Sequence, residues 1–431
     1  MSAAVNFDAL DVAAQAEVVV VGGGPGGLCA AVTAAEEGAD TLLIERYGFL
    51  GGMATAGLVN PFMTWHAGGR PIIRGLFERI LGRLDAEGGW TGPRQGSAFD
   101  AELLKLVADD LCCEAGVRLL LHTSLAAVDA ADGRVRRLAT ASKAGLQAVE
   151  GDIFIDGTGD GDLAAWAGAD VRLGRDEDGL SQPMTLCFRM LGVNLDAIPP
   201  RAEVGALYDA ARERGEIDNP RENVLLFFTT HSHEVHFNTT RIVKRNATDA
   251  EDMTAAELEA RRQVRQMVHF LIAEVPGFEG AWLQEMAPQI GVRESRRVMG
   301  DYLLTTEDVL AARKFDDGIA RGSYAVDIHN PAGTGTVIKR LPPGEAYDIP
   351  YRCLTPAGLG NLLIAARCVS CDHGAHSSLR VMPIVMAIGE AAGVAARMAL
   401  PGGDVRAIDV PALRARLVER GASIHGLSSD E

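Results

Sequence analysis

Short apolar runs alternate with small-residue segments over the first 44 residues of the chain. Residues 17–21 are mostly valine and lead into a glycine-rich turn, so they predict a strand buried on both faces. Residues 28–35 are small enough to form a helix close to a sheet, and residues 41–44 predict a second buried strand. This order of strand, turn, helix and strand predicts an α/β fold with a parallel sheet.

The pattern further along the chain extends this sheet. We expect a helix over 101–115, a strand over 117–122, and a β-ribbon formed by 125–128 and 134–140. Two more buried strands are expected at 153–155 and 362–366. Pro383 predicts the first turn of a helix that ends near residue 398, because proline fits that turn without losing a hydrogen bond.

The middle of the chain differs in character. Strand-like stretches occur within 182–191 and 224–242, and a long helix is expected over 252–273. We therefore expect an inserted α+β substrate or cap domain over 176–290. The flanking segments, 1–175 and 291–431, would together form one Rossmann-like domain.

Composition and charge exclude some classes of protein. The 431 residues include 41 basic and 58 acidic ones, a net charge of −17, which argues against nucleic-acid binding. No Lys or Arg precedes Arg46, as a secretory signal would require, and the apolar runs fall short of a membrane span. The seven cysteines form no regular framework, which suits free thiols. We expect a cytoplasmic protein that contacts neither nucleic acid nor membrane.

The first turn carries a nucleotide-binding fingerprint. Gly22, Gly24 and Gly27 satisfy the pattern G-x-G-x-x-G. The first glycine allows the tight turn, the second lets backbone approach a pyrophosphate, and the third lets helix and strand pack closely. Glu45 stands 18 residues after Gly27, where it can accept hydrogen bonds from the hydroxyls of an adenosine ribose. These features predict a dinucleotide site.

A glycine-rich block follows Glu45 and reads Arg-Tyr-Gly-Phe-Leu-Gly-Gly-Met-Ala-Thr, which suits a loop beneath an extended cofactor. Further blocks stand at 156–164, 291–302, 347–352 and 361–393. In this order, and over nearly the whole chain, they resemble the FAD-dependent oxidoreductases of the two-dinucleotide-binding superfamily. The resemblance implies FAD as cofactor. It also implies a late helix whose N-terminus points at the pyrimidine edge of the flavin.

The glycine fingerprint and the family resemblance together define the expected FAD contacts. Asp160 is expected to bind a ribityl hydroxyl, a backbone N–H or an arginine, or instead to cap the helix that follows. Residues 51–57 contain no histidine for a covalent link, so the FAD is expected to be non-covalent. The predicted contacts are Gly22, Gly24, Pro25, Gly26, Gly27, Glu45, Arg46, Gly51, Gly52, Met53, Ala54, Thr55, Gly159, Asp160 and Met382.

The loop before the late helix carries the catalytic candidates. The resemblance implies that it lies beside the isoalloxazine, so His373 and His376 are predicted to handle a proton and Arg380 to bind an anion. Arg293 and Arg296 belong to a dense charged block. That block is either an internal salt-bridge network or a clamp for a substrate carboxylate.

A histidine cluster at residues 231–236 raises the question of a metal site. If this stretch is a strand, His231 and His233 share one face and His236 points away. No cysteine or carboxylate completes a tetrahedral set, so we predict no metal. His236 and Arg241 are instead predicted to line the substrate pocket.

The leading functional hypothesis is an FAD-dependent oxidoreductase. It would transfer a hydride between a small polar metabolite, with a carboxylate as one option, and flavin N5. Two alternatives remain open: a flavin thiol–disulfide oxidoreductase using Cys368 and Cys371, and a non-redox flavoprotein such as an isomerase, hydratase or binding protein. There is no second fingerprint for a dedicated NADPH domain, so the electron donor or acceptor is not identified. A homo-oligomer is left open.

Overall fold

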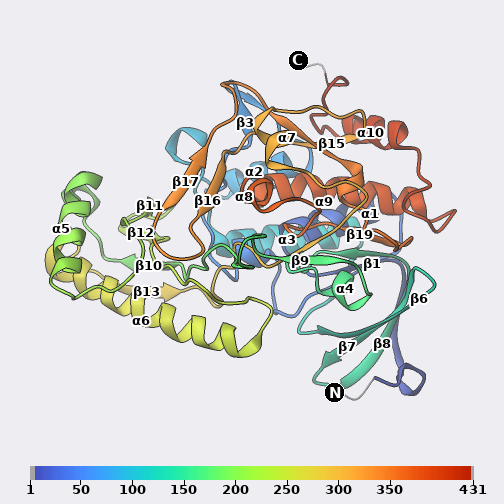
Figure 1. Cartoon of the computed structure of the whole chain (residues 1–431), viewed down its shortest axis with the longest axis horizontal. Helices are drawn as coiled ribbons and strands as arrows, with labels where there is room; N and C mark the ends of the chain where they lie inside the picture. Colours follow the sequence, from blue (N-terminus) through green and yellow to red (C-terminus); the bar gives the residue numbers. More distant parts are fainter. Residues whose placement is uncertain (1–4, 429–431) are drawn as a thin grey trace.

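A seven-stranded mixed sheet forms the centre of the computed structural model, which describes residues 5–428 (Figure 1). Four neighbouring strands and β19 run parallel, whereas β7 and β6 continue from β8 as the expected antiparallel ribbon. The predicted α/β class is confirmed. The order is β5 (Arg118–Leu120), β2 (Thr41–Ile44), β1 (Val12–Val21), β8 (Gly145–Asp156), β7 (Arg134–Ser142) and β6 (Ser124–Ala131), with β19 (Leu362–Ile364) on β8.

Two buried helices, α1 (Pro25–Glu36) and α9 (Met382–Ala399), pack against each other through glycines. A Cβ atom at Gly389 would lie 2.1 Å from the carbonyl oxygen of Gly26, and one at Gly393 would lie 2.5 Å from that of Ala30. Because only glycine leaves this space, the two backbones can touch. The contact fixes the N-termini of both helices relative to the sheet.

Valine at position 389 should therefore destabilise the protein by about 3 kcal/mol, since backbone cannot move aside for a new side chain. The measurement is the urea midpoint of the apoprotein. Gly82 lies in another helix, α2 (Leu76–Ala86), and a Cβ atom there would meet nothing within 4 Å. Gly82→Val should therefore leave the midpoint nearly unchanged. Equal effects of the two substitutions would contradict the close packing of α1 and α9.

Helix α9 also satisfies the length and composition of a membrane span. Among the residues that the structure describes, it is the one helix that does so, and 83% of it is buried inside the molecule. The burial accounts for its apolar character.

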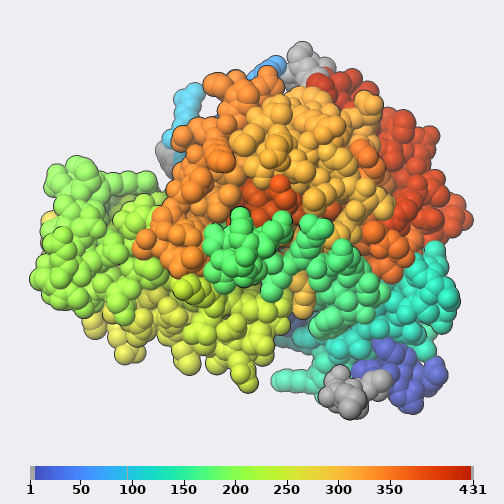
Figure 2. All heavy atoms as spheres, in the orientation of Figure 1, coloured from blue at the N-terminus to red at the C-terminus, as the bar shows by residue number. Residues whose placement is uncertain are grey.

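The predicted insertion contains a four-stranded antiparallel sheet flanked by two long helices. Figures 1 and 2 show it extending to the left of the main body. Its long helix matches the expectation over 252–273. Its members are β11 (Leu226–Phe228), β12 (Glu234–Phe237), β10 (Phe188–Leu191), β13 (Trp282–Met286), α5 (Arg201–Glu213) and α6 (Ala250–Glu274).

The condition that residues 231–236 form one strand holds only for their second half. His231 and His233 lie in the turn that leads into β12, and His233 has a φ of 65°, a left-handed conformation that interrupts a strand. Of these three histidines, only His236 lies on a strand.

A hairpin from the C-terminal part of the chain lies beside this sheet. It consists of β16 (Val326–His329) and β17 (Thr336–Lys339). The Arg241 guanidinium donates to the carbonyl oxygens of Gly333 and Gly335 in its tip, at 3.3 and 3.2 Å. The hairpin thus joins the predicted cap to the rest of the molecule.

The remaining elements connect these parts. They are α3 (Ala101–Ala115), α4 (Asp162–Trp166), α7 (Thr306–Leu310), α8 (His373–Leu379), α10 (Val410–Glu419), β3 (His66–Ala67), β4 (Arg70–Pro71), β9 (Val171–Leu173), β14 (Arg296–Val298), β15 (Gly318–Gly322), β18 (Tyr347–Pro350), and the 3-10 turns Phe7–Ala9, Gly52–Ala54, Pro93–Gln95, Leu195–Ala197 and Tyr351–Cys353.

Candidate functional site

One cavity of about 590 Å³ runs from the fingerprint turn to the predicted cap. This volume is typical of small-molecule and cofactor sites. One end, which we call the nucleotide end, is lined by residues that include Gly24, Glu45, Ser124 and Trp166. The other, which we call the cap end, is lined by Thr185, Arg221, Asn223, Asn238, Arg293, Tyr324, Asp327, His329 and Arg380, among others.

The fingerprint glycines have different physical tasks. A Cβ atom at Gly27 would lie 1.9 Å from the carbonyl oxygen of Gly22, and Gly22 itself has a φ of 96°. These two glycines are required by the packing of the protein itself. Gly24 is not, because its φ of −68° suits any residue and a Cβ atom there would lie 3.8 Å from its nearest neighbour. Gly24 lines the cavity, so its missing side chain leaves room for a ligand.

Glu45 lies buried at the end of β2 and organises the same turn. One carboxylate oxygen accepts the N–H of Gly23 at 2.7 Å, and the other accepts that of Tyr47 at 2.9 Å. Each oxygen keeps a further lone pair, and Glu45 lines the cavity. A held carboxylate with free lone pairs suits the hydroxyls of a ribose, so turn and acid together fit a dinucleotide.

Asp160 has an arginine partner, one of the options expected from the sequence. Its Oδ1 accepts hydrogen bonds from Arg367 at 2.6 Å and from Ser295 at 2.5 Å. The alternative of a helix cap is wrong, because Gly161 is the N-cap of α4 and the first N–H groups of this helix donate to Thr158 and Asp156 instead. Asp160 lines the cavity with its charge already balanced.

Most predicted FAD contacts line this cavity, and four do not. Gly51 donates its N–H to the carbonyl oxygen of Gly23 at 2.8 Å, and the Thr55 hydroxyl donates to that of Leu50 at 2.7 Å. The four residues that do not line the cavity lie behind its lining: Gly27, Gly51, Ala54 and Thr55. Those that line it are Gly22, Gly24, Pro25, Gly26, Glu45, Arg46, Gly52, Met53, Gly159, Asp160 and Met382.

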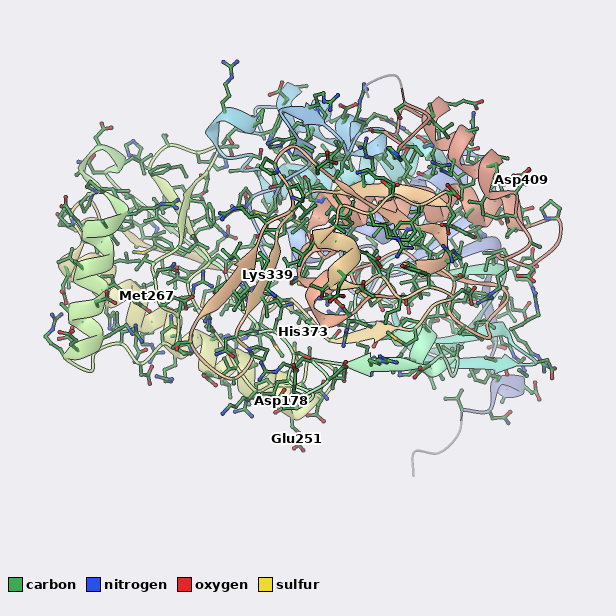
Figure 3. All side chains as sticks on the ribbon, turned by 45° about the horizontal axis from the view of Figure 1, so that its top comes forward. Asp178, Glu251, Met267, Lys339, His373 and Asp409 are labelled. Atoms are coloured by element: carbon green, nitrogen blue, oxygen red, sulfur yellow. The ribbon has the colours of Figure 1, made fainter. Side chains whose placement is uncertain are left out.

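The two histidines predicted to be catalytic do not line the cavity. His376 is fully buried on α8 with no partner for either ring nitrogen, and burial holds its pKa well below the usual value. His373, labelled in Figure 3, shares a hydrogen bond of 2.9 Å between its Nδ1 and the Glu294 carboxylate. Helix α8 turns both side chains into the protein. Only Arg380, directly after this helix, lines the cavity.

Three of the four predicted substrate contacts also lie elsewhere. His236 is buried on β12, where burial lowers its pKa to about 3. Arg241 pairs with Glu222 at 2.9 Å, and Arg296 pairs with Asp162 at 2.6 Å. Arg296 thus belongs to an internal ion pair, the alternative that the sequence left open. Arg293 alone lines the cavity.

A polar group on the β16 hairpin was not predicted. The Tyr324 hydroxyl donates to Asp327 Oδ2 at 2.9 Å, and His329 Nε2 lies 3.5 Å from the same oxygen. Burial raises the pKa of Asp327, but the hydrogen bond from His329 and the charge of Arg380 lower it far more. Burial lowers the pKa of His329 to about 3. At neutral pH this group is therefore an ionised carboxylate held by a neutral tyrosine and a neutral imidazole.

His329 is unsuited to accept a further proton. Its Nδ1 accepts a hydrogen bond from Arg241 at 3.2 Å, and Thr336 lies equally close. The Asp327 carboxylate is better placed, because its Oδ1 accepts no hydrogen bond from residues 5–428 and the residue lines the cavity.

The cysteine pair is inaccessible. Cys368 and Cys371 are both free and fully buried, and neither lines the cavity. Burial raises the pKa of both thiols well above the usual value. A thiolate, the reactive form, is therefore strongly disfavoured at both positions.

The histidine cluster is also dispersed. His231 Nε2 lies 2.6 Å from Asp100 Oδ2, and His233 Nδ1 lies 3.1 Å from the carbonyl oxygen of Val193. Over the described part of the chain, no group of three or more His, Cys, Asp or Glu is arranged to hold a metal ion.

Comparison with known proteins covers nearly the whole chain. A family model described as FAD dependent oxidoreductase matches residues 17–417. Among solved structures, a triple mutant of a flavin-dependent brominase gives a TM-score of 0.50 at 12% identity, covering 93% of this chain and 84% of that one. L-proline dehydrogenase from P. horikoshii gives 0.45 at 12% identity, covering 96% and 99%. At such identities the solved structures bear on the fold alone. No curated protein matches the chain.

Proposed function

We propose that this chain, which belongs to the family of FAD-dependent oxidoreductases, transfers a hydride between a small carboxylated metabolite and N5 of its flavin. The observation that carries the substrate class is Arg293. Its guanidinium lines the cap end and donates only to the Pro183 carbonyl at 2.7 Å and the Asn238 amide oxygen at 3.1 Å. A cation with neutral partners in a cavity favours an anionic ligand, and arginine suits a carboxylate geometrically.

The nucleotide end supports the binding of FAD itself. The N-terminus of α1 and the space at Gly24 would receive the pyrophosphate, and Glu45 the adenosine ribose. The bound flavin supplies the hydride acceptor. The N-terminus of α9 lines the cavity through Val381 and Met382, so its partial positive charge is available to the reduced cofactor.

The chain's own residues would hold the substrate and move its proton. Arg293 and Arg380 orient the carboxylated substrate, while Asp327 Oδ1 takes the proton that a hydroxyl or amine loses as its carbon gives up a hydride. Tyr324 and His329 keep the Asp327 carboxylate in one orientation through its other oxygen. This role for Asp327 replaces the one predicted for the histidines of α8.

The test begins with the visible spectrum of the purified protein before and after denaturation. We expect a flavin band whose pigment leaves the denatured chain, as non-covalent FAD would. Carboxylated metabolites are then mixed with the holoprotein without oxygen, and one class is expected to bleach the band. A flavin that no carboxylate bleaches, but that an uncharged metabolite reduces, would overturn the proposed substrate class. Binding and conversion of a metabolite without any bleaching would favour the non-redox alternative.

The burial of both cysteines argues against the thiol–disulfide alternative, and two substitutions test it. Cys368→Ala and Cys371→Ala are each expected to leave the rate of substrate-driven bleaching within about twofold, because neither thiol reaches the cavity. The measurement is anaerobic stopped-flow absorbance, with flavin content and melting temperature as controls for folding. A loss of reduction in both variants at full flavin content would restore the dithiol mechanism.

A further inference from the structure

The cap end carries more positive charge than its own carboxylates balance. Three arginines line it: Arg221, Arg293 and Arg380. Two acids line it as well, and only Asp327 has no arginine partner outside the cavity lining. The other acid, Glu222, pairs with Arg241 at 2.9 Å. Two guanidinium charges are left in excess. Enclosed charges are costly unless they are paired, so a ligand is expected to supply the missing negative charge.

The two arginines in excess can be identified. Arg293 donates only to neutral oxygens. The Arg380 side chain makes no hydrogen bond or ion pair within residues 5–428, although its charge acts on Asp327. The Nε atom of Arg380 is buried and without a partner. The two side chains also repel each other. Burial first, and then the charge of Arg380, lowers the pKa of Arg293 to about 9.

A ligand with a single negative charge would not balance both arginines. A carboxylate on Arg293 would still leave one of the two excess guanidinium charges unbalanced, and Arg380 is the other lining arginine without an ion pair. The FAD pyrophosphate belongs at the fingerprint turn around Gly24, where the N-terminus of α1 would receive it. The N-terminus of α9 would stabilise the negative charge of reduced flavin. The substrate must therefore bring a second anionic group.

We infer that the substrate is a small dicarboxylate, with one carboxylate held by Arg293 and the other by Arg380. This inference rests on the proposed function for its reaction, but it concerns binding alone. Asn223, Asn238 and Thr185 line the same end, and their neutral hydrogen-bonding groups suit the atoms between the two carboxylates.

The test uses the FAD-loaded protein and ligands that need not react. Malonate, succinate and glutarate are titrated against acetate, propionate and butyrate, and binding is read from the perturbed flavin absorbance and from the melting temperature. We expect at least one dicarboxylate to bind about tenfold or more tightly than every monocarboxylate. Arg293→Met and Arg380→Met should each reduce this preference to about onefold. Arg265→Met, an exposed position on α6, is the matched control and should retain it.

Two results would overturn the inference. One is that monocarboxylates bind as tightly as all three dicarboxylates, and the other is that Arg380→Met leaves the preference unchanged. Since the Arg380 side chain makes no hydrogen bond or ion pair within residues 5–428, this variant keeps the test available if Arg293→Met does not fold. Failure of the redox proposal is a separate result, because it would appear as absent bleaching with the dicarboxylate preference still measurable.

Discussion

Replacing Gly24 with valine is expected to weaken FAD binding strongly while leaving the protein folded. A Cβ atom at this position would meet no protein atom closer than 3.8 Å, and the backbone there is extended, so valine is compatible with the fold. The new side chain would occupy the space that the pyrophosphate needs. Overlap of this kind costs about 3 kcal/mol, which corresponds to at least a roughly hundredfold loss of affinity.

The measurement is a titration of the apoprotein with FAD, followed by the quenching of flavin fluorescence, with circular dichroism as the check on folding. Gly280→Val is the matched control, because this exposed loop glycine also has open space and no positive φ. Gly27→Val provides the contrast, since its Cβ would overlap a carbonyl oxygen and the protein itself should be destabilised. Wild-type affinity in Gly24→Val would mean that the pyrophosphate does not pass this turn.

The nucleotide end was predictable because its chemistry is local in the sequence. Gly22, Gly24 and Glu45 lie within one βαβ unit, so strand order alone brings them together. The glycines of α1 and α9 were recognisable as small, although their contact joins residues more than 360 positions apart. The sequence pattern does not show the task of each glycine. That task depends on whether protein or ligand fills the space beside the glycine.

The cap end was not predictable, because its residues come from distant segments with no shared motif. Arg221, Arg293, Asp327 and Arg380 are brought together only by the fold. His376 was favoured for its chemistry and its place near the late helix. Which side chains of a short helix face a cavity depends on the rotation of that helix, and α8 turns His376 inward. The signal that could have identified Asp327 is modest: a carboxylate on a short strand, with Tyr324 just before the strand and His329 at its end.

Replacing Asp327 with asparagine separates binding from chemistry. If this carboxylate takes the substrate proton, Asp327→Asn should slow flavin reduction about 10²- to 10⁴-fold. Anionic ligands should bind as tightly or more tightly, because one negative charge leaves a cavity that favours anions. The rate constant of reduction therefore falls while the affinity for the anion is kept or rises, a combination that loss of folding would not produce. Asp316→Asn, at an exposed position after α7, is the control and should change neither.

The pH dependence gives the same residue a second test. The pKa of Asp327 is lowered in the folded protein, so its proton-accepting form is present at neutral pH and is lost only as pH falls below the usual aspartate range. Burial and the Asp327 charge raise the pKa of Tyr324, so the hydroxyl that holds the carboxylate keeps its proton well into the alkaline range. We therefore expect substrate-driven reduction of the wild type to stay level between about pH 6 and 8. A rate that rises steeply through pH 6–7 would instead indicate a histidine base, and Asp327 would then be a positioning residue.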